Sequence, residues 1–283
     1  MADNGIFSSL DKLGLGMLSD MNLYEDEKQT SRNVVQNNVA VNKKINEEDM
    51  LFDKTFKCPV CDSDFKSKVV RTGKARMIGA DPDLRPRYED FDPIKYDSIV
   101  CSHCGYAALT RFFSHISTAQ IKFIRTNISP FFKGIDDNLS TYSYEEAVTR
   151  YELALANAVI KKGRASEIAY TCLKIAWLKR GAAENLSDDI KDKEAEIQKL
   201  KNEEKQYIVK AYEGFSNAMT KAVFPIWGMD EWTYVYLVAE LGYECEDFTK
   251  SMKLLSDLVV SKNATPKLKD KARELRKLMQ NKV

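Results

Sequence analysis

Four cysteines in two short pairs are the residues of this sequence best suited to chemistry. Cys58 and Cys61 lie in FKCPVCDSDFKSK, and Cys101 and Cys104 lie in VCSHCGYAALTRFF. Each pair has two residues between its cysteines, and such a turn lets two sulfurs face one point. Thiolates are soft ligands, and four of them suit a tetrahedral zinc ion. The two pairs predict one zinc ion per chain, with Gly105 free to adopt the left-handed conformation after the second pair.

The predicted site is structural, because four protein sulfurs leave no open coordination position and catalytic zinc keeps one. An iron–sulfur cluster is the second interpretation of the same four residues, and a thiol–disulfide couple is the third. His103 lies between the two cysteines of the second pair. With four sulfurs available, we expect its imidazole to be exposed and not a ligand.

The composition is that of a globular protein, with 44% hydrophobic and 30% charged residues in a chain of 283. No apolar run approaches the 18 or so residues of a transmembrane helix. The first residues, MADNGIFSSLDKLGLGMLSD, lack the basic and apolar regions of a signal peptide. We therefore expect a cytoplasmic protein, whose cysteines serve as metal ligands or free thiols and not as disulfides.

The cysteine pairs belong to a predicted module that spans residues 51–116. The segment FKSKVV alternates like a short strand, and KYDSIVC predicts a second strand that runs into the second pair. Between them, RTGKARMIGADPDLRPRYEDFDPIKYD contains two glycines and three prolines. We expect this insertion to be a loop.

Residues 117–283 form the predicted helical domain. Ser117 is a suitable N-cap for a helix that ends before Pro130. From Tyr144 onward the helical periodicity is strong, with breaks at 161–164, 185–189, 224–230 and 262–266. This pattern predicts an array of antiparallel helix pairs, in which the charged stretch 188–205 is a solvated, projecting helix.

An internal repeat resembles a degenerate tetratricopeptide unit. Two segments 64 residues apart share an Ala-aromatic-Ala pattern, namely Ala147, Tyr151 and Ala154, and Ala211, Phe215 and Ala218. Leu241, Gly242 and Pro266 match the other half of such a unit, in which the proline ends the second helix. On this register Cys172 and Cys245 are small apolar residues of a buried seam. A generic bundle of helical hairpins remains the alternative.

The first 50 residues form a separate predicted region. Residues 6–24 include a short amphipathic segment, and residues 25–50 are polar and predict a flexible linker. Whether the amphipathic segment docks on the chain itself or on a partner is open.

Residues Phe56 to Ala108 resemble bacterial domain-of-unknown-function family 2225. Beyond the cysteines, the specific part is an acidic-Leu-Arg-x-x-Tyr core, which here is Asp83, Leu84, Arg85 and Tyr88. The resemblance implies a zinc-ribbon-like module followed by tetratricopeptide-like helices. It implies no activity.

The same core allows two interpretations. In the first, Asp83, Arg85 and Tyr88 line a polar pocket in which an arginine binds a carboxylate or phosphate. In the second, these side chains attach an irregular loop to the ribbon and the first helices, which the loop requires because its backbone must find hydrogen-bond partners.

Three classes of function follow. The favoured one is a zinc-binding, non-catalytic scaffold for a partner protein or peptide, bound in a helical groove. The predicted groove residues are Tyr170, Lys174, Tyr236, Tyr243 and Asp247. An enzyme is disfavoured, because the sequence has no phosphate-binding glycine loop, nucleophile elbow or metal-plus-base constellation.

Nucleic-acid binding is the alternative, because a basic run without an acid lies beside the first cysteine pair. Its members are Lys66, Lys68, Arg71, Lys74 and Arg76. Against this alternative, no aromatic residue is interleaved in the run for base stacking. The charge is also uneven, since residues 54–133 sum to +6 and residues 134–261 to −6 within a net +1.

Overall fold

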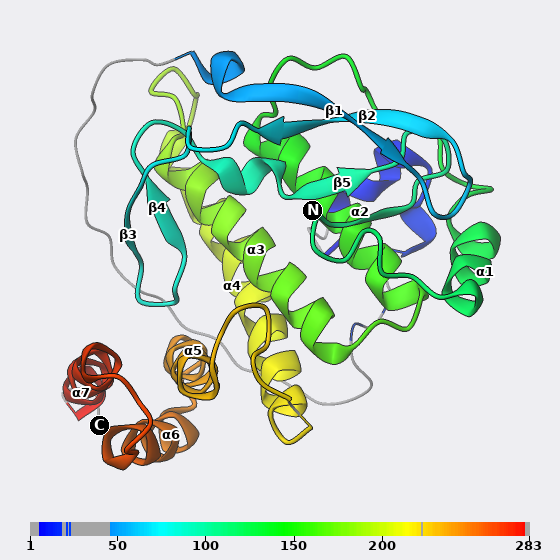
Figure 1. The fold of residues 1–283 in the computed structure, drawn as a ribbon. Helices are drawn as coiled ribbons and strands as arrows, with labels where there is room; N and C mark the ends of the chain where they lie inside the picture. The colour runs from blue at the N-terminus through cyan, green and yellow to red at the C-terminus, as the bar shows by residue number, and fades with distance from the viewer. Residues whose placement is uncertain (1–5, 19–20, 22, 24–45, 222, 281–283) are drawn as a thin grey trace.

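The computed structural model describes residues 6–18, 21, 23, 46–221 and 223–280. The fold is mainly α-helical, with small two-stranded antiparallel sheets ahead of the main helices, as predicted. Figure 1 shows the ribbon of β1 and β2 at the top and helices α5 to α7 at the lower left. Between them lie the long helices α2, α3 and α4.

Two hairpins carry the cysteine pairs. Strands β1 (Leu51–Lys57) and β2 (Asp64–Val70) pair antiparallel, and so do β5 (Ser98–Val100) and β6 (Ala107–Leu109). Both strands predicted from the sequence are therefore confirmed. Each cysteine pair lies in the turn of its hairpin, which gives the module the layout of a zinc ribbon.

The insertion between the two hairpins is more regular than predicted. It contains a third hairpin, β3 (Met77–Ala80) with β4 (Pro86–Tyr88), and the 3-10 helix η4 (Pro93–Tyr96). The expectation of a loop is therefore wrong for these segments. The tight turn between the strands uses Leu84, whose φ of 67° is left-handed. Prolines lie on either side of this residue, and because proline argues against a strand, the hairpin could not be predicted from the sequence.

The helices follow the four predicted breaks, and a further break at 245–247, which was not predicted, separates α5 from α6. The helices are α1 (Thr118–Asn127), α2 (Tyr144–Ile160), α3 (Ala165–Glu184), α4 (Lys193–Met219), α5 (Glu231–Glu244), α6 (Phe248–Val260) and α7 (Pro266–Gln280). Ser117 caps α1 in a capping box with Gln120. From α2 onward each helix packs against the next one in the chain. No helix in the described part of the chain is both long and apolar enough to cross a membrane.

The repeat register agrees with the packing in part. Tyr151 and Phe215 are fully buried, and a Cβ on Gly242 would lie only 2.4 Å from Ser251 Oγ of the next helix. Pro266, however, is the first residue of α7 and not the last of a helix. Proline is tolerated there because the first helical turn has no use for its missing N–H. The tetratricopeptide likeness stays a prediction.

The amphipathic N-terminal segment packs on the chain itself. It forms the 3-10 helices η1 (Ser8–Leu13) and η2 (Gly16–Leu18), and its apolar side chains join the main core. Ser9 donates from its backbone N and its Oγ to Glu152 Oε2 of α2, at 3.2 and 2.6 Å. Residues 25–45 of the predicted linker lie outside the described residues. The linker's last residues form a third 3-10 helix, η3 (Glu47–Met50).

We predict that Leu10→Ala destabilises the folded protein by about 2–5 kcal/mol, because Leu10 is fully buried and its truncation leaves a cavity. Met17→Ala in the same segment is the matched control, since Met17 is 56% exposed, and we expect a change within about 0.5 kcal/mol. Urea unfolding of the two variants measures both values. Equal stabilities would show that the segment adds nothing to the core.

Candidate metal centre and the charge cluster beside it

The four paired cysteines converge on one point. Their sulfurs all lie within 4.8 Å of one another. The Sγ atoms of Cys58 and Cys104 are 3.6 Å apart, and so are those of Cys61 and Cys101. A disulfide needs about 2.05 Å, whereas sulfurs at about 2.3 Å from a tetrahedral zinc are about 3.8 Å apart. The donor set and its spacing therefore fit one thiophilic metal ion.

The two turns are built alike. The amide of Cys58 donates to Ser63 O at 3.0 Å, and that of Cys101 donates to Tyr106 O at 2.8 Å. The residue after each pair is left-handed, with φ of 62° at Asp62 and 73° at Gly105, which confirms the prediction for Gly105. A Cβ at Gly105 would lie 2.6 Å from the Phe132 ring, so the close approach excludes any larger residue.

Two helices hold the turns from behind. Arg125 of α1 donates from Nε to Val60 O at 2.8 Å, and Asn157 of α2 donates from Nδ2 to Gly105 O at 3.0 Å. Cys58 and Cys101 are fully buried. The site is thus fixed to the helical domain and not only to the hairpins.

His103 is exposed, as predicted, and its Nε2 lies 3.2 Å from Asp64 O. This contact turns the ring to the backbone of the other hairpin. Sulfur atoms alone make up the first coordination sphere that the geometry offers.

The electrostatics of the four sulfurs shows why a cation suits the site. The neighbouring sulfurs of Cys104 and Cys58 lower the pKa of Cys101, whereas the neighbouring Cys101 raises the pKa of Cys58. Several thiolates at this spacing repel one another unless a positive ion lies between them.

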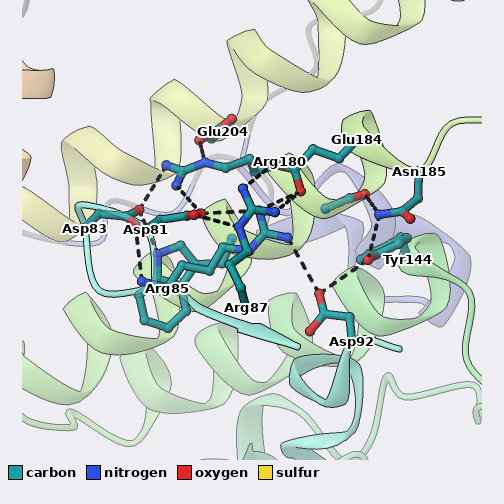
Figure 2. Close-up of polar contacts among 12 residues, drawn as sticks. Asp81, Asp83, Arg85, Arg87, Asp92, Tyr144, Arg180, Glu184, Asn185 and Glu204 are labelled. Carbon is teal, nitrogen blue, oxygen red and sulfur yellow. Dashed lines mark hydrogen bonds and ion pairs between the residues drawn. The ribbon is translucent and has the colours of Figure 1, made fainter. Parts of the chain in front are cut away.

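A cluster of paired charges lies where the insertion meets α3 and α4 (Figure 2). We call it the charge cluster; it comprises Asp81, Asp83, Arg85, Arg87, Asp92, Arg180, Glu184 and Glu204. Asp83 is fully buried. Its Oδ2 accepts hydrogen bonds from Trp177 Nε1 at 2.8 Å and lies 2.9 Å from Arg180 Nη2.

Arg85 completes the attachment of the insertion. Its guanidinium is buried and lies 3.1 Å from Glu184 and 3.9 Å from Asp92. Arg87 binds the same Glu184 through two hydrogen bonds of 2.6 and 2.7 Å. The close approach depends on Gly181 of α3, where a Cβ would lie 2.7 Å from the ring of Tyr144 and 3.0 Å from Arg85 Nη2.

The interpretation of an open polar pocket is therefore wrong for Asp83 and Arg85, because their charges are buried and paired within the chain. Tyr88 lies half-buried on β4, and burial raises the pKa of its hydroxyl. The second interpretation, in which this core attaches the insertion, agrees with the contacts.

Sequence reasoning missed the helical half of the cluster. Arg180 lies between Asp83, Glu204 and Glu244, at 2.9, 2.6 and 3.8 Å. The available signal was Arg180 itself, a charged residue three positions after Trp177 in a helix that is otherwise rich in apolar residues. The charged stretch 188–205 is largely exposed, as predicted, but its last turn is not: Glu203 and Glu204 pair with Lys179 and Arg180.

The predicted groove residues do not form one exposed surface. Lys174 is buried in an ion pair with Asp97, and Tyr236 is buried with its hydroxyl 3.3 Å from Glu240 Oε2. The ring of Tyr170 stacks on Trp227 with centroids 5.1 Å apart.

The other two groove residues also have partners within the chain. Tyr243 packs on Phe248, and Asp247 caps α6 while it accepts a hydrogen bond of 2.6 Å from Tyr212. The groove prediction is corrected accordingly, because the side chains that the repeat register placed outside are used to pack neighbouring elements together.

The fold and the four-cysteine centre define a mainly α-helical protein with a metal-ribbon module at its N-terminal side. The family described as "Uncharacterized protein conserved in bacteria (DUF2225)" matches residues 51–279. The chain belongs to this family, and the resemblance seen in the sequence is confirmed. No curated protein and no solved structure matches the chain.

Glu240 of α5 extends the electrostatics of the charge cluster toward the C-terminal helices. Burial and the nearby charge of Asp83 raise the pKa of Glu240 to about 7, against the smaller opposing effects of Tyr236, Arg180 and Lys271. The side chain is 4% exposed. The folded protein therefore binds a proton that the unfolded chain releases at lower pH.

We predict that the folded state loses roughly 3 kcal/mol as the pH rises from below the ordinary glutamate pKa through 7, because a raised carboxyl pKa favours the protonated folded form. Glu240→Gln, which cannot ionise, should be the more stable protein at pH 8 and should lose this pH dependence. Urea unfolding at pH 5.5 and pH 8 measures the difference. Exposed Glu274→Gln is the control and should behave like wild type; a Glu240→Gln variant with the wild-type pH dependence would contradict the assignment.

Proposed function

We propose that the protein is a zinc-binding, non-catalytic scaffold that presents surfaces to a partner protein or peptide. The observation that carries the proposal is the convergence of Cys58, Cys61, Cys101 and Cys104 on one point. Four thiolates satisfy tetrahedral zinc completely, so no position is left for substrate or water. The proposal places the protein in the cytoplasm, where reducing conditions keep thiolates available for metal.

The proposed zinc ion acts as a staple between the hairpins and the helices. Two-stranded hairpins are marginal on their own. The metal joins the turns of both, and Arg125 and Asn157 attach these turns to α1 and α2. A metal in this place stabilises the relative orientation of ribbon and helical domain.

We predict about one zinc per purified chain, and less than about 0.3 in Cys58→Ser or Cys101→Ser, because such sites bind with about 10–16 kcal/mol and depend on all four ligands. Elemental analysis measures the content. Cys245→Ser is the matched control and should keep its zinc, since Cys245 ends α5 far from the ribbon.

Hydrogen exchange measured after a chelator has removed the metal shows which segments the metal stabilises. Protection should fall across 51–112 and in α1, which Arg125 connects to the metal turn, and should persist in α5 to α7. Iron in place of zinc, or a metal content unchanged by the cysteine variants, would overturn the zinc assignment.

The β3–β4 hairpin is the surface that we assign to the partner protein. Met77 and Ile78 on this hairpin are 57% and 63% exposed, and the base of the hairpin is fixed by the charge cluster. Large apolar side chains on a rigid support supply contact area with little loss of conformational entropy.

We predict that a photo-crosslinking residue in place of Ile78 captures one discrete protein in cells, identified by mass spectrometry, because the hairpin faces the partner. The same residue in place of Val260, which is 78% exposed at the end of α6, is the control and should capture nothing specific. The same adducts from both positions, or none from position 78, would contradict the assignment.

A further inference from the structure

The β1–β2 ribbon and the turn that follows it are strongly basic. Residues 53–76 contain seven cations against three acidic residues. Two of the cations have ion-pair partners, Lys68 with Asp53 at 2.8 Å and Arg76 with Glu89 at 2.9 Å. The other five are exposed and have no ion pair within the described part of the chain; they are Lys54, Lys57, Lys66, Arg71 and Lys74.

The strand pairing places these cations on both faces of the ribbon. Phe52 and Lys54 of β1 share a face with Phe65, which is buried, whereas Lys57 and Lys66 lie on the opposite face. Because the sheet has only two strands, a ligand that passes over the free edge of β1 can reach both sets.

An aromatic ring lies within this basic surface. Phe52 is 38% exposed, and the guanidinium of Arg71 lies over its ring at 5.7 Å from the centroid. In the sequence the basic run after Phe65 has no aromatic residue, but the strand pairing brings Phe52 of β1 opposite Val69 and next to Arg71. We call Phe52, Lys54, Lys57, Lys66, Arg71 and Lys74 the ribbon surface.

We propose that the ribbon surface binds single-stranded nucleic acid, a function beyond that of a zinc-stapled scaffold. Unpaired cations attract phosphates along the strand, and an exposed ring with a guanidinium beside it gives an unpaired base a stacking platform. An acidic peptide would use the cations but not the ring. A membrane surface would need a wider apolar area than one half-exposed phenylalanine.

Fluorescence anisotropy of full-length, zinc-loaded protein tests the proposal, with fluorescein-labelled 20-nucleotide oligothymidylate and oligouridylate as probes. We expect saturable binding that weakens steeply with salt, by about 0.7 in the log–log slope for each cation engaged. Phe52→Ala should weaken binding by about tenfold with the salt slope unchanged, because it removes stacking and no charge. Lys54→Ala with Lys66→Ala should weaken binding and lower the slope by about 1.4.

Charge-matched controls separate this site from general attraction to a basic protein. Lys262→Ala with Lys267→Ala removes two exposed cations near the start of α7, far from the ribbon, and should leave binding unchanged. Zinc content and melting temperature of every variant should equal those of wild type, since none of the changed residues is a metal ligand.

Four outcomes would overturn the proposal. The first is the absence of saturable binding to either probe at low salt. The second is an equal loss of affinity in the α7 control, and the third is wild-type affinity in Phe52→Ala. Polyglutamate or anionic vesicles that displace the probes as well as unlabelled oligonucleotide does would assign the surface to another class of partner and would also contradict it.

Discussion

The convergence of four cysteine sulfurs is the constraint on which the ribbon module depends. It joins two cysteine pairs separated by 39 residues, and neither of the hairpins that carry them has a sheet wider than two strands to support it. Closing so long a loop costs only about 0.6 kcal/mol more per doubling of its length. The free energy of binding a structural zinc, about 10–16 kcal/mol, exceeds that cost by far. The insertion can therefore be long without preventing the site.

A long insertion needs a second point of attachment, because the four cysteines join only the hairpins on either side of it. The charge cluster supplies it. Breaking a buried ion pair typically costs about 3–5 kcal/mol, so Asp83 and Arg180 hold the insertion to α3 only while both are present. The cluster also places more carboxylates than arginines around Arg180. Burial, followed by the nearby charge of Asp83, raises the pKa of Glu240.

Local signals in the sequence predicted local structure well. The cysteine spacing, the Ser117 cap and the breaks between helices each depend on a few neighbouring residues, and all were confirmed. The prediction of a partner-binding groove was wrong for a different reason. Lys174 pairs with Asp97, 77 positions away, and only the packed structure brings the two together. The docking of the N-terminal segment and the partners of Asp83 are contacts of the same long-range kind.

In the β1–β2 hairpin, the side chains that stabilise the fold and the side chains that form the surface are different ones. Phe65 and Leu51 are buried, while Phe52, Lys54 and Lys66 on the same two strands are exposed. Because Arg125 holds the turn of the hairpin and the body covers its buried side chains, the exposed side chains have a fixed support. Their charges contribute little to folding, since even paired surface charges are worth only about 0–1 kcal/mol. Five exposed cations without an ion pair among the described residues, on a ribbon that also exposes Phe52, are thus better explained by a negatively charged, base-bearing ligand than by the needs of the fold.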